Sequence, residues 1–241
     1  MSTRRGPGQL KQEAAVNPVS LIRKYKESDA WLWTEVAAVV IGLAFVIPTA
    51  IALWIDLQDR QMQRIAQAWQ LLTQLAPGNS GKGPALEYLN SQGISLTGIN
   101  LSTGDDQAGV FLFQVNLSGA DLILANLSEA DLREANLSRA EVMGADLSGA
   151  KLEKADLSGA ILLDVDLSEA YLQGADLSEA YLVGANLSRA YLGSANLSRT
   201  YLDDADLTDA VGLTQSQLDI ACGDDKTLLP DGLTIKVCAK Q

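Results

Sequence analysis

One hundred consecutive residues, 110–209, repeat a five-residue pattern of the form AxLxx, and this period constrains the fold of the chain. The third position is Leu in nineteen of the twenty units and Val142 in the other, and the first position is Ala in sixteen. On an α-helix five residues turn about 500°, so successive leucines would drift by about 140°. On a straight strand an odd period sends alternate leucines to opposite faces. Neither regular element can bury all the leucines together.

The pattern is satisfied if the chain bends through a right angle once per unit. Every leucine and every preceding alanine then points to one axis, and four bends close a square coil. Successive coils stack at about 4.8 Å through backbone hydrogen bonds. Twenty units make five such coils, so residues 110–209 are expected to form an all-β solenoid.

These units, of which ANLSE at 125–129 and ADLSG at 145–149 are typical, resemble the pentapeptide repeat family. The resemblance implies a right-handed quadrilateral β-helix in which Leu and Ala fill the interior, with Asp or Asn between them. The sequence departs from that pattern where other residues replace Asp or Asn, at Phe111, Glu141, Lys151, Ile161, Tyr171, Tyr181, Tyr191 and Tyr201. The family's functions are diverse, so the resemblance predicts a fold and not an activity.

A run of twenty uncharged, mostly apolar residues at 36–55 predicts one transmembrane helix. Trp31, Trp33 and Trp54 stand at its ends, where amphipathic rings favour the membrane interface. Pro48 lies inside the run, and transmembrane helices tolerate such a kink. One alternative is a buried core helix, but the repeat is self-contained and leaves no other part of the chain to cover twenty apolar residues. The other alternative is a secretory signal cleaved at Ala50-Ile51-Ala52.

The basic residues near this span predict its orientation. Arg23, Lys24 and Lys26 precede it, whereas Arg60 and Arg64 follow it. Because cytoplasmic flanks carry the excess of Lys and Arg, a cytoplasmic N-terminus is expected. The repeat would then lie on the exported side of a single-pass protein.

The segments around the span and the repeat complete a linear domain order. Residues 1–35 are expected to form a loosely ordered polar tail with a short helix before the span. Residues 56–76 predict an amphipathic helix that continues from the membrane. This helix is expected to serve as a plain structural linker. The alternatives are that its apolar stripe pairs with a second copy, lies on the lipid surface or packs on the end of the solenoid.

Caps are expected at both ends of the repeat. Residues 77–109 predict a linker and an N-terminal cap, with a short helix at 84–90 and a first, atypical coil interrupted by an insertion loop at 104–109. Residues 210–241 predict a C-terminal cap that begins with a two-turn helix at 215–222, started by a T-x-x-Q capping box. Such caps cover the exposed sheet edges of a solenoid.

Composition excludes several classes of function. The net charge of −12 and the absence of His argue against a nucleic-acid binder, which would be basic. The glycine-rich stretch at 77–83 lacks the spacing of a phosphate loop. No cofactor or catalytic set is predicted, and stacked carboxylates such as Asp156 and Asp176 suggest only a weak calcium site.

The two cysteines, Cys222 and Cys238, both lie in the predicted C-terminal cap. Two sulfur atoms without His or further Cys do not make a zinc site. A disulfide is expected if the domain is exported, and two free thiols are the alternative.

Units that are twenty residues apart share a face of the prism. Two opposite faces repeat NLS or DLS, which turn chemistry explains, because Asn, Asp and Ser can bond the backbone at each bend. A third face is expected to carry a vertical apolar stripe outward, made of Ile123, Leu124, Met143, Ile161, Leu163, Tyr181, Val183 and Tyr201. Stacked rungs of this kind either support neighbouring coils or form a contact surface.

Two functions compete on these grounds. The first is a non-enzymatic, membrane-anchored interaction or scaffold module that binds a protein partner or a second copy through the apolar stripe. The second is an acidic DNA-mimic regulator of a DNA-binding enzyme, as the family resemblance allows. The second requires a cytosolic repeat with a continuous acidic face, against which the predicted anchor and the stripe both argue.

Overall fold

The computed structural model describes residues 18–73, 81–102 and 109–238 and divides the chain into two units, Met1–Gln61 and Met62–Gln241. Three expectations fall wholly or mostly outside the described residues. They are the first 17 residues of the polar tail, the start of the linker at 77–80 and most of the insertion loop at 104–109.

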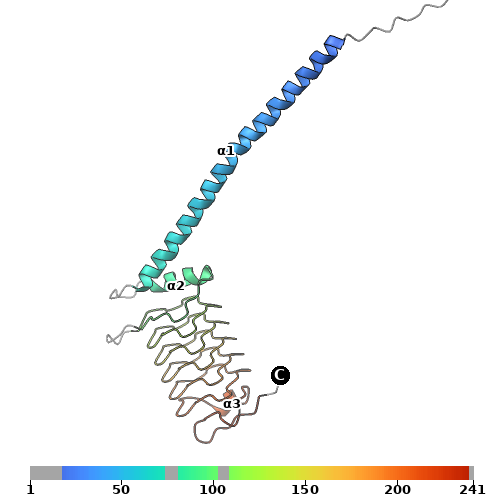
Figure 1. Ribbon diagram of the computed structural model, residues 1–241. Coiled ribbons are helices and arrows are strands. Elements are labelled where there is room, and N and C mark those ends of the chain that lie inside the picture. The colour runs from blue at the N-terminus through green and yellow to red at the C-terminus, as the bar shows by residue number, and fades with distance from the viewer. Residues whose placement is uncertain (1–17, 74–80, 103–108, 239–241) are drawn as a thin grey trace, which may run out of the picture. The chain divides into compact units, whose positions relative to one another are not determined.

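Helix α1 (Pro18–Thr73) is continuous over 56 residues (Figure 1). The short helix expected before the span is therefore part of α1, and residues 18–35 are helical instead of loosely ordered. A proline is favoured in the first turn of a helix because its missing N–H has no intrahelical acceptor there. No glycine or further proline interrupts the sequence before Gly42, so the helix runs unbroken into the apolar stretch.

Within the described residues, α1 is also the one helix long and apolar enough to cross a membrane, over Leu32–Thr73. Its apolar side chains are exposed, Phe45 by 71% and Trp54 by 62%. Pro48 removes one backbone donor, and the hydroxyl of Thr49 donates to the carbonyl oxygens of Phe45 and Val46, both at 2.9 Å. A signal sequence near an N-terminus meets the same criteria of length and composition.

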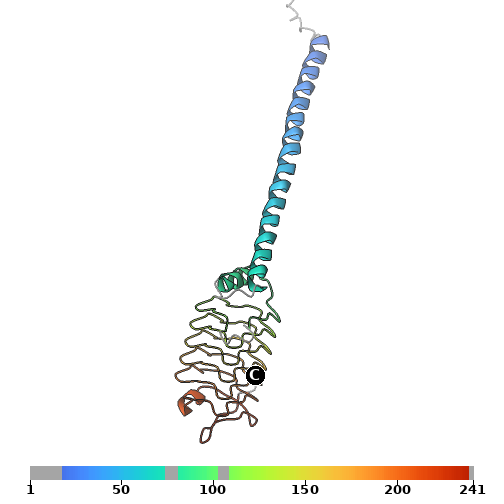
Figure 2. The same cartoon turned by 90° about the vertical axis from the view of Figure 1, so that its left-hand side faces the viewer.

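The second unit is a four-sided solenoid whose coils stack in parallel (Figure 2). Residues twenty apart pair directly: Asp146 pairs with Asp166, and Asp166 pairs with Asn186. The N–H of Leu127 donates to the carbonyl of Asp146 at 2.8 Å, and the N–H of Asp146 donates back to Ala125 at 2.9 Å. Each face contributes single bridges, not long strands, because the chain turns again after five residues.

The corners of the solenoid are β-turns with a left-handed residue. In the unit at 125–129, Ala130 donates its N–H to Leu127 at 3.1 Å, and Glu129 has a φ of 60°. Glycine occupies the same place in other units, such as Gly149, because it adopts this conformation without strain. The right angle that the five-residue period required is this turn.

The core is a column of leucines surrounded by alanines. Leu127, Leu147 and Leu167 are at most 1% exposed, and so is nearly every other residue at these two positions of the repeat. Thr200 replaces an alanine, and its buried hydroxyl donates to the carbonyl of Leu177 at 2.8 Å, which satisfies the polar group.

Two helical segments cover the N-terminal end. Helix α2 (Lys82–Ser91) buries Leu86 and Leu89 completely, and its Glu87 accepts the backbone N–H of Asn116 at 2.7 Å. The last turns of α1 add Ala68 and Leu72, each 4% exposed, to the same core. The apolar stripe of this amphipathic segment therefore packs on the end of the solenoid.

The first coil is incomplete. Asn100 pairs with Asn126, a spacing of 26 instead of 20, so six residues are inserted before the regular coils begin. Leu96 and Leu101 are buried in the same column as the repeat leucines. This coil supplies only two faces, and α2 takes the place of the coil on a third face. There Glu87 accepts the backbone N–H of Asn116, and Asn90 donates to the carbonyl of Ser118 at 3.1 Å.

At the C-terminal end, α3 (Gln215–Leu218) is one turn long, so the two-turn helix expected at 215–222 is wrong. The backbone beyond it joins the solenoid instead: Ile220 accepts from Arg199, and Cys222 pairs with Tyr201. Gln217 accepts the N–H of Thr214, as a capping box requires. Its amide also donates to the carbonyls of Leu192 and Ala195 at 2.9 Å, closing the core.

We expect Leu157→Ala to lower the free energy of unfolding by about 2–5 kcal/mol, because this fully buried leucine would leave a cavity between coils. Leu124→Ala is the matched control, since Leu124 is 64% exposed, and should change stability by less than about 0.5 kcal/mol. Urea unfolding of the full-length chain, followed by circular dichroism, measures both. Equal losses in the two variants would contradict the assignment of the core.

Candidate interaction surface

The solenoid presents its outward side chains in vertical columns. Within each unit the second, fourth and fifth residues point outward, and the twenty-residue spacing places like positions above one another. The surface therefore divides into four faces: an apolar face (units 120–124, 140–144, 160–164, 180–184, 200–204), a mixed face opposite it (units starting at 110, 130, 150, 170 and 190), and two Ser faces between them.

On the Ser faces, side chains mainly stabilise the turns. The side-chain oxygen of Asn126 accepts the backbone N–H of Ser128 at 3.1 Å and its hydroxyl at 2.8 Å, and other units repeat this bond. Asn186 donates its amide to Asp166 in the coil before it, at 3.1 Å. Among the described residues no group of three or more potential ligands could hold a metal ion.

The apolar face carries the stripe that the sequence predicts, but the stripe is only partly accessible. Ile123, Met143, Leu163 and Val183 are half-buried, because each is covered by the coils on either side. Leu124 is 64% exposed and Tyr181 is 41% exposed. The accessible apolar surface is thus formed by the edges of the stripe more than by its middle column.

Two tyrosines of this face support each other. The rings of Tyr181 and Tyr201 are stacked, with centroids 4.9 Å apart and an interplanar angle of 6°. Ile161 precedes them in the same column of bridged residues. Stacking holds the rings against the solenoid and leaves their edges to the solvent.

All five charged side chains of the repeat units that form the apolar face are acidic, a feature that sequence reasoning overlooked although the sequence shows these charges. They are Asp121, Glu141, Asp164, Asp203 and Asp204. The hydroxyls of Ser95 and Thr97 donate to Asp121 and lower the pKa of its carboxyl. Lys226 of the C-terminal cap lies 3.8 Å from Asp204.

The mixed face is different, because its acids and bases are balanced, three of each. Arg133 donates to both carboxylate oxygens of Asp131, at 2.7 and 2.6 Å, and this bond lowers the pKa of Asp131. The same guanidinium lies 5.8 Å from the centre of the Phe113 ring. Arg133 and Asp131 therefore satisfy each other, whereas one carboxylate oxygen of Glu153 on the same face is buried without a hydrogen-bond partner among the described residues.

A shallow cavity of about 210 Å³ runs along one corner, between the mixed face and a Ser face. Its lining comprises Glu129, Gly149, Glu169, Tyr171, Arg189 and Tyr191. Arg189 pairs with Glu169 at 3.1 Å, and the two tyrosine rings stack at 4.8 Å. The charged groups at its centre are already paired, so the cavity offers little to a ligand.

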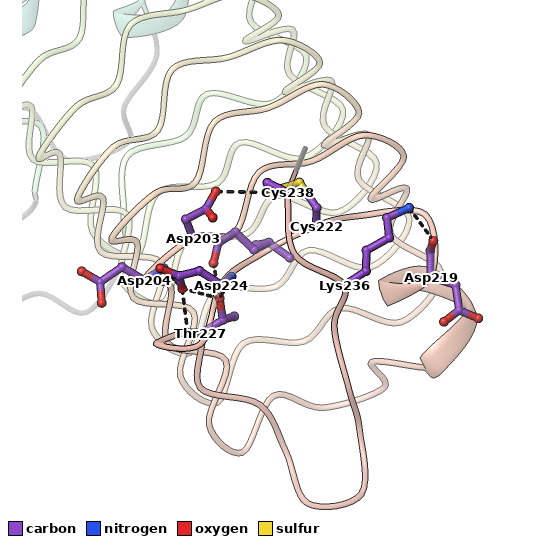
Figure 3. Close-up of a disulfide and its surroundings, with 9 residues drawn as sticks. Asp203, Asp204, Asp219, Cys222, Asp224, Thr227, Lys236 and Cys238 are labelled. Atoms are coloured by element: carbon purple, nitrogen blue, oxygen red, sulfur yellow. Dashed lines mark hydrogen bonds between the residues drawn. A yellow bond between two sulfur atoms is a disulfide. The ribbon is translucent and has the colours of Figure 1, made fainter. Parts of the chain in front are cut away.

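A disulfide between Cys222 and Cys238 lies at the C-terminal end of the apolar face (Figure 3). Cys222 continues the column of Tyr201, and the tail returns to it because Gly223 pairs with Val237. The Sγ atom of Cys238 lies 3.1 Å from a carboxylate oxygen of Asp203, a contact in which the disulfide sulfur has no proton to donate. The bond fastens the tail over the last coil.

Close to the disulfide, Asp224 organises the turn at 224–227. Its carboxylate accepts the backbone N–H groups of Asp204 and Lys226, at 2.9 and 3.1 Å. These bonds, that from Asp204 above all, lower the pKa of Asp224. Lys236 donates to the carbonyl of Asp219 at 2.9 Å, so the tail is held by hydrogen bonds as well as by the disulfide.

Reducing the disulfide should lower the free energy of unfolding by about 3 kcal/mol, the loop-closure value for a separation of 16 residues. Urea unfolding with and without dithiothreitol measures this change in the wild-type chain. The Cys222→Ser, Cys238→Ser double variant is the control, because the reductant should not affect it. If dithiothreitol does not lower the urea midpoint of the wild-type chain, a stabilising role for the disulfide is contradicted.

Comparison with known proteins agrees with this architecture. The protein-family model for pentapeptide repeats, which comprises eight copies of the repeat, matches residues 112–149, 150–189 and 185–211. No curated protein matches the chain.

Several solved structures are similar to the repeat region. A pentapeptide repeat protein from Nostoc PCC 7120 is 30% identical, over 43% of this chain and 84% of its own, with a TM-score of 0.23. One from the Arabidopsis thaliana thylakoid lumen is 29% identical, with a TM-score of 0.24, over 42% of this chain and 58% of its own length. One from the cyanobacterium Cyanothece 51142 is 24% identical, over 59% and 95%, with a TM-score of 0.32.

The TM-scores are low, so the assignment rests on the repeat match and on the periodic core that the structure shows. Most of the leucine column, of the alanine ring and of the bridges between residues twenty apart lie within the matched residues. Through residues 112–211, the chain therefore belongs to the pentapeptide repeat family.

Proposed function

We propose that this chain is a non-enzymatic, membrane-anchored interaction module whose apolar face binds a protein partner. The observation that carries the proposal is the accessible apolar edge on that face, where Leu124 and Tyr181 are exposed by 64% and 41%. Contiguous apolar surface on a rigid scaffold is typical of contact sites. The interior has no such role, because the leucine column is closed at both ends.

The anchor follows from the exposure of α1. Val39, Phe45 and Trp54 are each more than half exposed, and a helix with such side chains on all sides is stable in lipid rather than in water. The uncleaved helix is favoured over a signal sequence because α1 continues past Ala52 to Thr73 and buries Leu72 in the solenoid core.

Two observations support an exported solenoid. A disulfide persists in an oxidising compartment and is rare in the cytosol. The basic residues Arg23, Lys24 and Lys26 precede the span and favour a cytoplasmic N-terminus. The alternative, an acidic DNA-mimic regulator, needs a cytosolic repeat with a continuous acidic face. On the apolar face, Asp121 and Glu141 are separated by apolar residues from Asp164, Asp203 and Asp204, so the carboxylates do not form one continuous row.

A topology experiment tests the anchor and the orientation. Alkaline phosphatase fused after Gln241 should be active, and a fused β-galactosidase should be inactive, if the solenoid is exported. Mass spectrometry of the purified membrane protein should find the N-terminal segment intact. Cleavage after Ala52 would establish a signal sequence instead, and a cytosolic C-terminus would favour the DNA-mimic alternative.

Photo-crosslinking tests the binding face. A benzoylphenylalanine introduced at Tyr181 should give a discrete protein adduct in intact membranes, and Leu124→Ser should reduce its yield, because it removes apolar contact area. The matched control carries the same group at Phe111, an exposed aromatic residue of the mixed face. Adducts of equal yield at both positions, or none at Tyr181, would refute the proposal.

A further inference from the structure

The apolar side chains of the apolar face are arranged as a diagonal band. They begin at the corner column with Leu124, cross the middle column and end in the bridged column with Tyr181 and Tyr201. The band comprises Leu124, Ile123, Met143, Leu163, Val183, Ile161, Tyr181 and Tyr201. Gly144 follows Leu124 in the corner column, and the Leu124 side chain lies across its Cα.

The acidic residues lie in the two parts of the apolar face that the diagonal band does not cover. Asp121 and Glu141 precede the apolar residues in the bridged column, whereas Asp164 and Asp204 lie in the corner column beside the later coils. Glu141 and Asp164 are exposed, and no ion pair is formed by either within the described part of the chain. The band therefore has carboxylates along both of its sides and no base in its own units.

This charge pattern argues against a second copy as the occupant. Two apolar faces in contact would bring ten carboxylates together, five from each, and no Lys or Arg of these units could pair with them. Like charges that are brought together at an interface are destabilising and suppress the wrong partner. A complementary partner has an apolar centre and positive charge on both margins.

We propose that the apolar face binds a cationic amphipathic helix of another protein. The inference rests on the proposed function and names the partner of that same face. Five coils span about 19 Å at about 4.8 Å per step, which matches a helix of about 13 residues at 1.5 Å per residue. Its apolar stripe packs on the diagonal band, and Lys or Arg on either side of the stripe pairs with Glu141 and Asp164.

The probes are three synthetic helical peptides of 16 residues that share one apolar stripe and carry Lys, Gln or Glu beside it. Binding to the full-length chain in nanodiscs of uncharged phosphatidylcholine is measured by fluorescence anisotropy. We expect the Lys peptide to bind at least about tenfold more tightly than the Gln peptide and the Glu peptide not to bind. Raising the salt from 50 to 500 mM should remove most of that preference, because salt screens exposed charges.

The decisive variant is Glu141→Gln with Asp164→Asn, which should abolish the preference for Lys over Gln. Its matched control is Glu129→Gln with Asp209→Asn, two exposed acids of a Ser face, which removes the same charge and should leave the preference unchanged. If both variants weaken binding equally, attraction to an acidic protein in general explains the result, and the inference is overturned.

The remaining outcomes separate this inference from the proposed function. If the three peptides bind equally and Leu124→Ser with Tyr181→Ser abolishes all binding, the face binds partners but charge does not select them. If no peptide binds while Tyr181 still gives its crosslinked adduct, the partner is not a cationic helix. Dimers in sedimentation equilibrium that the same double serine variant dissociates would identify a second copy as the occupant.

Discussion

Every feature of the solenoid depends on the backbone hydrogen bonds between neighbouring coils. The bond from Leu127 to Asp146 and the return bond from Asp146 to Ala125 fix both the spacing of the coils and their register. A slip by one residue would move the leucines out of the core and place polar side chains inside it. These hydrogen bonds thus fix the positions of the buried and the exposed side chains alike. Each outward side chain therefore has defined neighbours in the coils above and below.

The same bonds create a difficulty at the two ends, where a coil has no partner on one side. The chain solves it differently at each end. At the N-terminus, α2 and the last turns of α1 cover the leucine column, and Glu87 bonds the free N–H of Asn116. At the C-terminus, the amide of Gln217 donates to the carbonyls of Leu192 and Ala195, and the tail is fastened by the disulfide. Both devices prevent coils of different molecules from stacking end to end.

Function must lie on the exterior, because the interior is nearly the same in every coil. The Ser faces use their side chains in turns, and the mixed face carries equal numbers of acids and bases, of which Arg133 pairs with Asp131. The apolar face differs from both: its carboxylates at Glu141 and Asp164 form no ion pair in the described structure, and Leu124 remains open to solvent. A surface with apolar groups and unpaired charges of one sign is the part of this molecule that a partner can stabilise.

The sequence by itself determined the coil length, the register, the buried positions and the side chains that share a face, because a strict five-residue period admits one such arrangement. It also indicated the apolar span, a helix near Leu86 and the T-x-x-Q cap. Only the tertiary structure decided how much of the stripe is accessible, since the coils above and below cover Met143 and Leu163. It also decided that the helix after Thr214 ends at Leu218, because the bridge to Tyr201 takes Cys222 into the solenoid, and that the tail brings Cys238 to it. Local patterns specify periodic structure, whereas exposure and the ends of elements depend on contacts between residues that are distant in the chain.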